Sequence, residues 1–551
     1  MTSPDELVAR FVRPDTHVHL AMTPSRPNAA TYALARAFAG TRSLTVSMSA
    51  VHSAAHALAM SGAVREMITG FLGDTYPTPR PNILYRDVVR EQPFRVEPWS
   101  LLSLLQRLVA GGTGQPYAVT TSLSGSDLCA DKDGLLRELP DPDGGETPLL
   151  LAKAMRPDVT VIHGVCADSR GNLVLVPPVG EGPWSAYAAK EGVLATVERI
   201  VPDSVLDRYP DRIVVPGQRV IGICEAPYGA HPNSLGTSGV EGMDGYRDDY
   251  EFLLDIARRG NDIEALAQWH REWVLQVDGH AGYLDKLGAR RLRDLRLTRP
   301  PIAPKPKPAP QTATATERAV ILGARVIAKS VLLGGYDTLL AGIGASHLAA
   351  WLAAGRLRAA GKDVKICAET GVYGQRPTPG DVFLFSREHG AEQFSGIAEV
   401  LGGMAVGNAS RCLGVVGAGE VDPLGNINTC VLPDGRWITG SGGANDIVSA
   451  VDSIVVAVAS RRRYVGTVAH VTSPGRRVRE VVSQFGSFQR DTQDQKFHLH
   501  SWLPGDAEAA GEDVFRFTCW PAPEREYVTE PPITPAELSE LRGVDPEGYY
   551  R

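Results

Sequence analysis

The pattern of hydrophobic and polar positions repeats once along the chain: an apolar, β-branched run leads into a tight polar turn, and a second apolar run follows. The first copy covers residues 159–163, the turn DSRGN at 168–172 and residues 173–176, and the second covers 413–416, the turn DPLGN at 422–426 and residues 427–431. Runs of this kind are typical of buried strands, and tight turns prefer Asp, Gly and Asn. One such turn arises easily by chance, but a copy in each half predicts duplicated halves.

Helical periodicity is found between these runs. Residues 346–354, for example, are rich in helix formers and place apolar side chains three and four positions apart. Strands that alternate with helices indicate sheets with parallel neighbours. We therefore predict an α/β fold made of two related open α/β domains with largely parallel sheets.

A stretch rich in proline, alanine and threonine separates the halves. Residues 300–317 read PPIAPKPKPAPQTATATE, with Ile302 as the only large apolar residue. Such a composition predicts an extended, semi-rigid linker. We expect domains at 1–299 and 318–551, each large enough for its own hydrophobic core.

Composition excludes several classes of protein. The net charge of -7 argues against a general affinity for nucleic acid or anionic membranes. No apolar stretch approaches the roughly 20 residues that cross a bilayer, and the N-terminus lacks a secretory pattern, so we expect a cytoplasmic protein. The seven cysteines are scattered without C-x-x-C spacing, which disfavours a disulfide framework and a cysteine zinc site.

A carboxylate and a downstream glycine loop form the strongest chemical signal. Glu369 lies in the tetrad AETG, and the loop GSGGAND occupies 440–446. Gly442 and Gly443 lack side chains, so their N–H groups can approach an oxyanion closely. Asn445 is expected near the start of the next helix, as a cap. The alternatives are a solvated glutamate and an ordinary glycine loop before a helix.

The order of these and other motifs resembles that of the class I coenzyme A transferases, in particular the glutaconate-type enzymes with α and β subunits. Motifs like those of α subunits lie at 25–30, 97–100, 107–116, 125–128, 163, 167–172 and 196–198, and motifs like those of β subunits lie at 342–345, 368–371, 419–422, 440–446 and 472–475. The resemblance covers nearly the whole chain and implies two subunits fused through the linker. The chain departs from it at 21–24, where AMTP replaces a glycine pair that many members carry.

The resemblance implies that Glu369 is the nucleophile. A carboxylate can attack a thioester carbonyl to give a mixed anhydride, and the released CoA thiolate then forms a glutamyl-CoA thioester while the acid leaves. Gly442, Gly443 and Asn445 are expected to serve an oxyanion or CoA, as are Gly342 and Gly344, whose loop lacks the third glycine of a dinucleotide site.

Glu97 is the candidate for a second acid in the first half. Related ring-opening hydrolases rely on an acidic residue from the α half, and Glu97 is the best match here. A structural ion pair is an equally good interpretation of this residue.

The expected function is transfer of CoA from an acyl-CoA donor to a carboxylic acid by a ping-pong mechanism. Acyl-CoA and the acid are then the partners, CoA is a substrate, no tightly bound cofactor is expected, and the resemblance implies a homodimer. An acyl-CoA hydrolase or a C–C ring-opening hydrolase on the same fold is the main alternative. A catalytically silent binder of CoA esters is another.

A metal-dependent amidohydrolase is a less favoured alternative. His17 and His19 form an H-x-H pair on a predicted strand, where both imidazoles share one face, and the string resembles the first metal-binding strand of that class. Further ligands on later strands are not evident in the sequence, and two halves do not suit a single barrel. His52 and His56 are four apart on a predicted helix, where ordinary core or surface histidines are the simpler interpretation. We predict no metal site.

Overall fold

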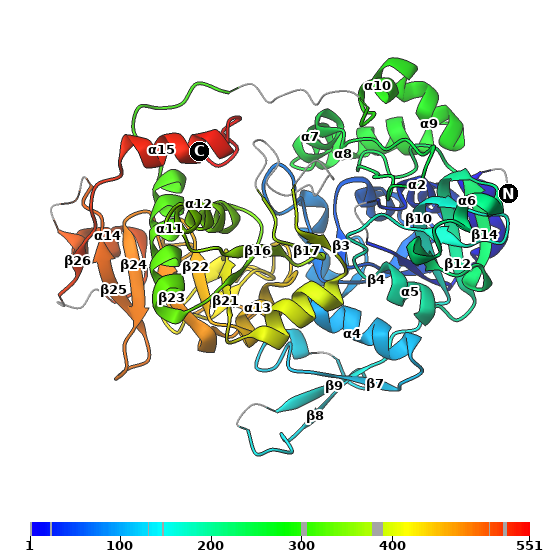
Figure 1. The fold of residues 1–551 in the computed structure, drawn as a ribbon. Helices are drawn as coiled ribbons and strands as arrows, with labels where there is room; N and C mark the ends of the chain where they lie inside the picture. The colour runs from blue at the N-terminus through cyan, green and yellow to red at the C-terminus, as the bar shows by residue number, and fades with distance from the viewer. Residues whose placement is uncertain are drawn as a thin grey trace.

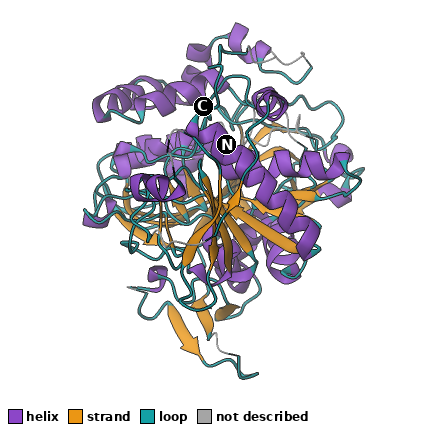
Figure 2. Cartoon of the chain, turned by 90° about the vertical axis from the view of Figure 1, so that its left-hand side faces the viewer, coloured by secondary structure: helices purple, strands orange, loops and turns teal. Residues whose placement is uncertain are grey.

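Two largely parallel sheets, one in each half, form the frame of the computed structural model (Figure 1). The structure describes residues 3–22, 25–130, 132–145, 148–298, 306–376, 390–505, 507, 509–521 and 526–551. The two large sheets lie in the interior with helices around them, and a small group of strands projects at the lower edge (Figure 2). Among the described residues, every helix is too short or too polar to span a bilayer.

The sheet of the first half is built on one long buried strand. All nine residues of β10 are buried, as their apolar and β-branched sequence predicts. Neighbouring strands are parallel through the order β14, β12, β10, β1, β2, β4 and β6. Their bounds are β1 (His17–Leu20), β2 (Leu44–Ser47), β4 (Val64–Thr69), β6 (Arg95–Pro98), β10 (Val159–Ala167), β12 (Gly192–Ile200) and β14 (Val220–Glu225).

The sheet of the second half repeats this arrangement. Its parallel part has the order β23, β22, β19, β15 and β16. Antiparallel strands extend both edges, and β26 then pairs in parallel with β25. The bounds are β15 (Thr338–Ala341), β16 (Lys365–Ala368), β17 (Val372–Tyr373), β18 (Gln393–Phe394), β19 (Cys412–Val416), β22 (Ser453–Val456), β23 (Val478–Val482), β24 (Gly486–Arg490), β25 (Phe497–Trp502) and β26 (Val528–Thr529). Strands β1, β2, β10, β12 and β14 thus correspond to β15, β16, β19, β22 and β23. The predicted fold class is confirmed.

Helices pack on both sheets and join the halves. The main ones are α1 (Pro4–Phe11), α2 (Asn28–Ala37), α4 (Leu101–Gly112), α5 (Gly182–Ala188), α7 (Tyr250–Arg259), α11 (Ala315–Gly334), α12 (Ala345–Ala359), α13 (Ala444–Ala450) and α15 (Pro535–Val544). Helices α11 and α12 pack together over the second sheet, whereas α4 of the first half contacts α13 of the second. Leu101, Leu102 and Leu105 of α4 belong to the same buried cluster as Ile447 and Val448 of α13. The two halves therefore share part of one core.

The duplicated turns have the same hydrogen bonds. In the first, both carboxylate oxygens of Asp168 accept hydrogen bonds from Asn172, from its main-chain N at 2.9 Å and from Nδ2 at 2.8 Å. In the second, Asp422 accepts from Asn426 in the same way, at 3.0 and 3.1 Å. One detail differs from the prediction. The second turn joins β20 (Glu420–Val421) to β21 (Ile427–Asn428), and these two strands form a separate small sheet. The apolar run at 413–416, which was expected to lead into the turn, lies in β19 of the large sheet.

Each turn also anchors a glycine further along the chain. The Oδ1 atom of Asn172 accepts from the N–H of Gly217 at 3.0 Å, and that of Asn426 accepts from the N–H of Gly475 at 2.9 Å. A Cβ atom at either glycine would lie 2.0 or 2.4 Å from a carbonyl oxygen of the turn, so only glycine fits. Both glycines belong to a Pro-Gly-x-Arg-Val string that leads into the last parallel strand, β14 or β23. These strings extend the repeat that the turns revealed.

The predicted linker at 300–317 falls partly outside the described residues. Its final three residues form the first turn of α11, where Thr314 and Glu317 make a capping box. The domain boundaries at 299 and 318 stay a prediction.

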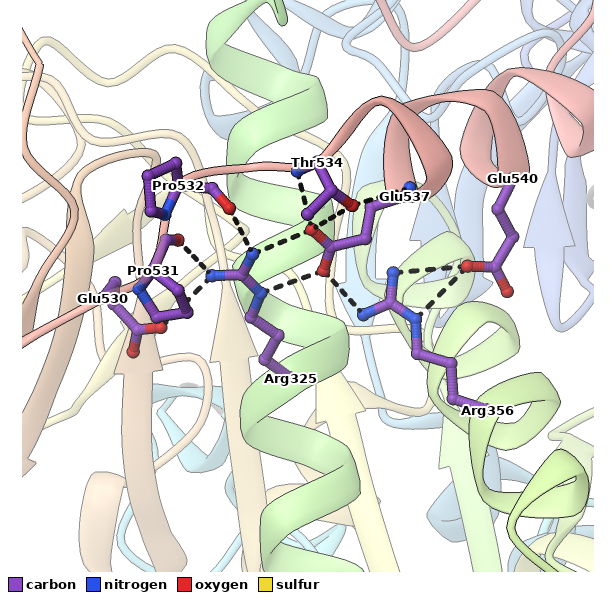
Figure 3. A network of polar contacts seen from close by, with 8 residues as sticks. All are labelled: Arg325, Arg356, Glu530, Pro531, Pro532, Thr534, Glu537 and Glu540. Carbon is purple, nitrogen blue, oxygen red and sulfur yellow. Dashed lines mark hydrogen bonds and ion pairs between the residues drawn. The ribbon is translucent and has the colours of Figure 1, made fainter.

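An ion-pair network fastens α15 to α11 and α12 (Figure 3). Arg325 of α11 donates to both carboxylate oxygens of Glu537, at 3.0 and 2.8 Å, and Arg356 of α12 lies 3.3 Å from the same carboxylate. Although burial alone raises the pKa of Glu537, hydrogen bonds from Arg325 and the Thr534 N–H lower it to about 2. The lowered pKa shows that the folded state favours the ionised carboxylate.

We predict that Glu537→Gln loosens α15. Losing two charge-assisted hydrogen bonds should speed hydrogen exchange of the α15 amides by about tenfold at pH 7. Because the folded pKa lies below the ordinary value of 4.5, the contribution is complete above about pH 4.5 and is lost as the pH falls toward 2. The difference between variant and wild type should shrink over that window. Glu540→Gln, whose carboxylate is 41% exposed, is the control and should have little effect. Equal exchange in Glu537→Gln and wild type would contradict the prediction.

Candidate active site

A pocket lined by residues of both halves lies where the two halves meet. In both halves it is lined by residues that follow the carboxyl ends of corresponding parallel strands: Met22 after β1, Ser49 after β2, Ile343 after β15 and Glu369 after β16. Open parallel sheets bind ligands at these ends, because the strand termini leave a crevice there. The duplicated architecture thus places two such edges around one cavity.

Glu369 lines this pocket and contacts the predicted glycine loop. Its Oε2 atom accepts a hydrogen bond from the Gly443 N–H at 3.0 Å. A Cβ atom at residue 443 would lie 2.1 Å from that oxygen, so the approach requires glycine. The tetrad and the loop that the sequence singled out are therefore brought together.

The carboxylate of Glu369 is held in an environment that opposes its ionisation. Burial is the main cause, the neighbouring carboxylate of Asp446 adds to it, and the Gly443 N–H acts in the opposite direction; together they raise the pKa of Glu369 to about 7. Burial also raises the pKa of Asp446 to about 6, against hydrogen bonds that lower it. Near neutral pH, Glu369 can therefore gain or lose its proton readily, and its ionised form is poorly solvated.

The first turn of α13 connects the halves beside Glu369. The Oδ2 atom of Asp446 accepts from the Leu102 N–H at 2.9 Å, at the amino end of α4. Asn445 accepts from the Leu123 N–H at 2.8 Å and donates to the Thr472 carbonyl at 2.9 Å. The side chain of Asn445 is fully buried in these contacts, and Gly443 occupies the N-cap position of the helix. Asn445 thus joins the halves instead of capping the helix or facing the pocket.

Gly442 is part of the pocket wall, but its amide is already used. Its N–H donates to the Gly70 carbonyl at 2.9 Å, and its own carbonyl accepts from the Leu101 N–H at 3.0 Å. Of the two predicted amide donors, Gly443 is therefore the one that faces the Glu369 carboxylate.

The loop Gly342-Ile343-Gly344 places its central residue at the site. Ile343 lines the pocket, whereas the Gly342 N–H donates to the Val415 carbonyl at 2.8 Å and Gly344 is the N-cap residue of α12. Among the described residues, the pocket lining includes neither glycine.

Glu97 lies outside the pocket lining of the described chain. Its Oε1 atom accepts from Trp99 Nε1 at 2.6 Å and from Arg107 at 3.0 Å. Arg107 is almost fully buried and lies over the Trp99 ring, 4.0 Å from its centroid. These contacts correspond to the structural ion pair, the alternative that the sequence left open.

The histidines of the metal-site alternative have other partners. His17 and His19 do share a face of β1, as the spacing predicts, and both reach the Ser47 hydroxyl, at 2.8 and 2.9 Å. His52 contacts Arg26, while His56 contacts Tyr85 and Asp74. Within the described ranges, no three His, Cys, Asp or Glu side chains are grouped to hold a metal ion.

Sequence reasoning does not assign a role to Arg26, which lines the pocket from the first half. It belongs to the motif at 25–30, which identifies its place in the order of motifs but not its chemistry. Its side chain is only 7% exposed, and burial lowers its pKa to about 10. Burial of this kind depends on contacts far apart in the chain, which no local pattern reveals.

Comparison with known proteins extends these observations. Residues 1–226 match the family model described as coenzyme A transferase. The chain is 26% identical to one subunit of glutaconate CoA-transferase from Acidaminococcus fermentans over 310 residues, 53% of this chain and 93% of that subunit. It is 35% identical to the other subunit of the same enzyme over 71 residues, which is 12% of this chain and 27% of the matched protein.

Two further relatives are similar over different lengths. The chain is 32% identical to one subunit of 3-oxoadipate CoA-transferase from Pseudomonas knackmussii over 192 residues, 34% of this chain, and spans 64% of that relative. The acyl-CoA transferase YdiF of E. coli O157:H7, solved as a thioester complex with CoA, shares the fold with a TM-score of 0.64 at 14% identity, over 96% of this chain and 93% of that one. Residues 1–226 thus match the coenzyme A transferase family, parts of the chain are similar to both subunits of glutaconate CoA-transferase, and nearly all of the chain shares the fold of an acyl-CoA transferase.

Proposed function

We propose that the protein is a CoA-transferase that moves CoA from an acyl-CoA donor to a carboxylic acid through a thioester on Glu369. The observation that carries this proposal is the placement of Glu369. A carboxylate whose pKa is raised by burial lines a pocket between the halves, with one main-chain N–H, that of Gly443, directed at it.

The chemistry follows from this placement. An ionised carboxylate with little solvation is a stronger nucleophile than one in water, and its attack on the thioester carbonyl releases CoA thiolate. The thiolate then attacks the Glu369 carbonyl of the mixed anhydride, where an oxyanion forms at the position of the carboxylate oxygen. The Gly443 N–H already lies 3.0 Å from Oε2 and is the donor for that charge. The acceptor acid reverses these steps.

The proposal includes CoA as a substrate and no tightly bound cofactor. The relatives named as glutaconate and 3-oxoadipate CoA-transferases support acyl-CoA and carboxylic acids as the reactants. We further propose that the protein works in the cytoplasm as a homodimer.

Glu369→Ala should abolish transfer. Removing the nucleophile is expected to lower kcat by about 10⁴-fold or more. Mass spectrometry of the wild type after incubation with an acyl-CoA should show a CoA-sized adduct on a peptide that contains Glu369. Asp434→Asn, an exposed acid in the same half, is the control and should keep both activity and adduct. Transfer that persists in Glu369→Ala would refute the assignment, and release of free CoA without an acceptor acid would point to a hydrolase.

The pH dependence of kcat/KM should report the ionisation of Glu369. Because only the carboxylate attacks, kcat/KM should rise through about pH 7, the raised pKa of this group, and level off above it. Asp446→Asn removes a negative charge beside Glu369, so the rise should shift to lower pH, while the asparagine oxygen can still accept from Leu102. An unchanged midpoint in Asp446→Asn would show that Asp446 does not act on Glu369. Asp434→Asn serves again as the control.

Glu369→Gln should be more stable than the wild type at pH 8. The folded protein binds this proton more tightly than the unfolded chain does, since the folded pKa is raised from 4.5 to about 7. The wild type therefore loses stability as the pH rises from about 4.5 to 7, and the variant does not. We expect a gain of about 1–3 kcal/mol in the free energy of unfolding at pH 8, measured with urea, and no gain below about pH 4.5. Equal stability at pH 8 would mean that Glu369 is not strained by burial.

A further inference from the structure

The proposed transfer needs a second hydrogen-bond donor beside Glu369. In the first step, one oxygen of this carboxylate adds to the thioester carbonyl carbon, and the carbonyl oxygen of the acyl group takes up the electron pair. The pair then returns, the C–S bond breaks, and CoA leaves as a thiolate. The Gly443 N–H is bound to Oε2 of Glu369 itself, so it serves charge on the glutamyl carbonyl and not charge on the acyl group.

Several donors beside the carboxylate are already engaged. The Gly371 N–H donates to the Ala368 carbonyl at 3.1 Å, and the Gly442 N–H donates to the Gly70 carbonyl at 2.9 Å. The hydroxyl of Ser441 donates to the Gly442 carbonyl at 3.0 Å. Recruiting any of these groups would break a hydrogen bond that holds the tetrad or the glycine loop in place.

Thr370, the residue after Glu369, carries a hydroxyl without a partner. The residue lines the same pocket, and its Oγ1 atom is shielded from solvent and forms no hydrogen bond within the described part of the chain. Leaving a buried hydroxyl unpaired costs roughly 1–3 kcal/mol, which favours a ligand that pairs with it. The hydroxyl hydrogen rotates and the side chain has staggered alternatives, so the group can turn toward a substrate.

We propose that the Thr370 hydroxyl donates a hydrogen bond to the acyl carbonyl oxygen while Glu369 attacks, and so stabilises the first oxyanion of the reaction. This inference rests on the proposed function, because it assumes that the thioester carbonyl meets Glu369. The two residues are consecutive in the turn after β16, and both line the pocket. The step neither gains nor loses a proton, so it suits a neutral hydroxyl that keeps its hydrogen. Thr370 and Gly443 thus serve one oxyanion each.

Thr370→Val tests this role, because valine has nearly the same shape without the hydroxyl. The rate at which an acyl-CoA forms the Glu369 adduct, followed by rapid quenching and mass spectrometry, should fall by about 10²-fold, a typical effect of removing one oxyanion donor. Thr370→Ser should restore most of the rate. Thr429→Val is the control and should keep the wild-type rate, because Thr429 is a half-buried threonine of the same half outside the described pocket lining.

A second measurement separates this role from a structural one. Hydroxylamine attacks the Glu369 carbonyl of the adduct and releases CoA, and the oxyanion of that reaction forms on the glutamyl oxygen, where the Gly443 N–H lies. Hydroxylamine should therefore release CoA from the Thr370→Val adduct as fast as from the wild-type adduct. A general distortion of the site would slow both reactions.

The outcomes distinguish this inference from the proposed function. A wild type that forms no Glu369 adduct would overturn the proposed function and this inference with it. Adduct formation at the wild-type rate in Thr370→Val would overturn the inference alone. An equal loss in Thr370→Ser, or slower release by hydroxylamine, would also overturn it. Thr370→Ala removes the same hydroxyl without adding bulk, so it should show the same loss and covers the case in which the valine variant does not fold.

Discussion

The contact between the amino ends of α4 and α13 is the interaction on which the site depends. The Leu102 N–H of α4 donates to Asp446, and Leu123 of the first half donates to Asn445. A carboxylate at the amino end of a helix is favoured by the unpaired N–H groups there. Each buried hydrogen bond of this kind contributes about 1 kcal/mol net, but losing one partner leaves a buried polar group unpaired and costs more. The glycine loop precedes these residues, so the same contacts hold the Gly443 N–H against Glu369.

This arrangement connects stability with chemistry. A carboxylate whose pKa is raised by burial and by a second acid is costly to ionise in the folded protein. The same cost would favour the proposed attack of the ionised form on a thioester carbonyl. Contacts elsewhere in the fold offset this free-energy cost. They include the shared core of α4 and α13 and the ion-pair network of Glu537 with Arg325 and Arg356. A strained active site supported by a stable frame is common among enzymes.

The duplicated halves contribute different chemistry from equivalent positions. Strands β2 and β16 correspond in the two sheets, and both end at the pocket. After β16 the chain presents Glu369, whereas after β2 it presents Ser49 and Ala50, whose carbonyl accepts from Arg26. The second half thus places at the pocket the carboxylate that we propose as the nucleophile, and the first half places there a cation, Arg26, on the segment that follows β1. A pocket between two copies of one unit allows each to vary without disturbing the other's sheet.

The local sequence is enough to predict the fold class, the duplication and the residue types of the Glu369 tetrad and the glycine loop. Strand periodicity, turn chemistry and the glycine loop are local properties, since they follow from the side chains and dihedral preferences of neighbouring residues. The motif order leads us to expect Glu369 beside the glycine loop, and in the structure the Gly443 N–H donates a hydrogen bond to it. The roles of Glu97 and Asn445 are less accessible to local reasoning. Glu97 lies with Arg107 and Trp99, and Asn445 joins the two halves. These contacts, like the burial of Arg26 and the raised pKa of Glu369, depend on groups that are distant in the chain. The contact of Asn445 with Leu123 forms only when the two halves dock.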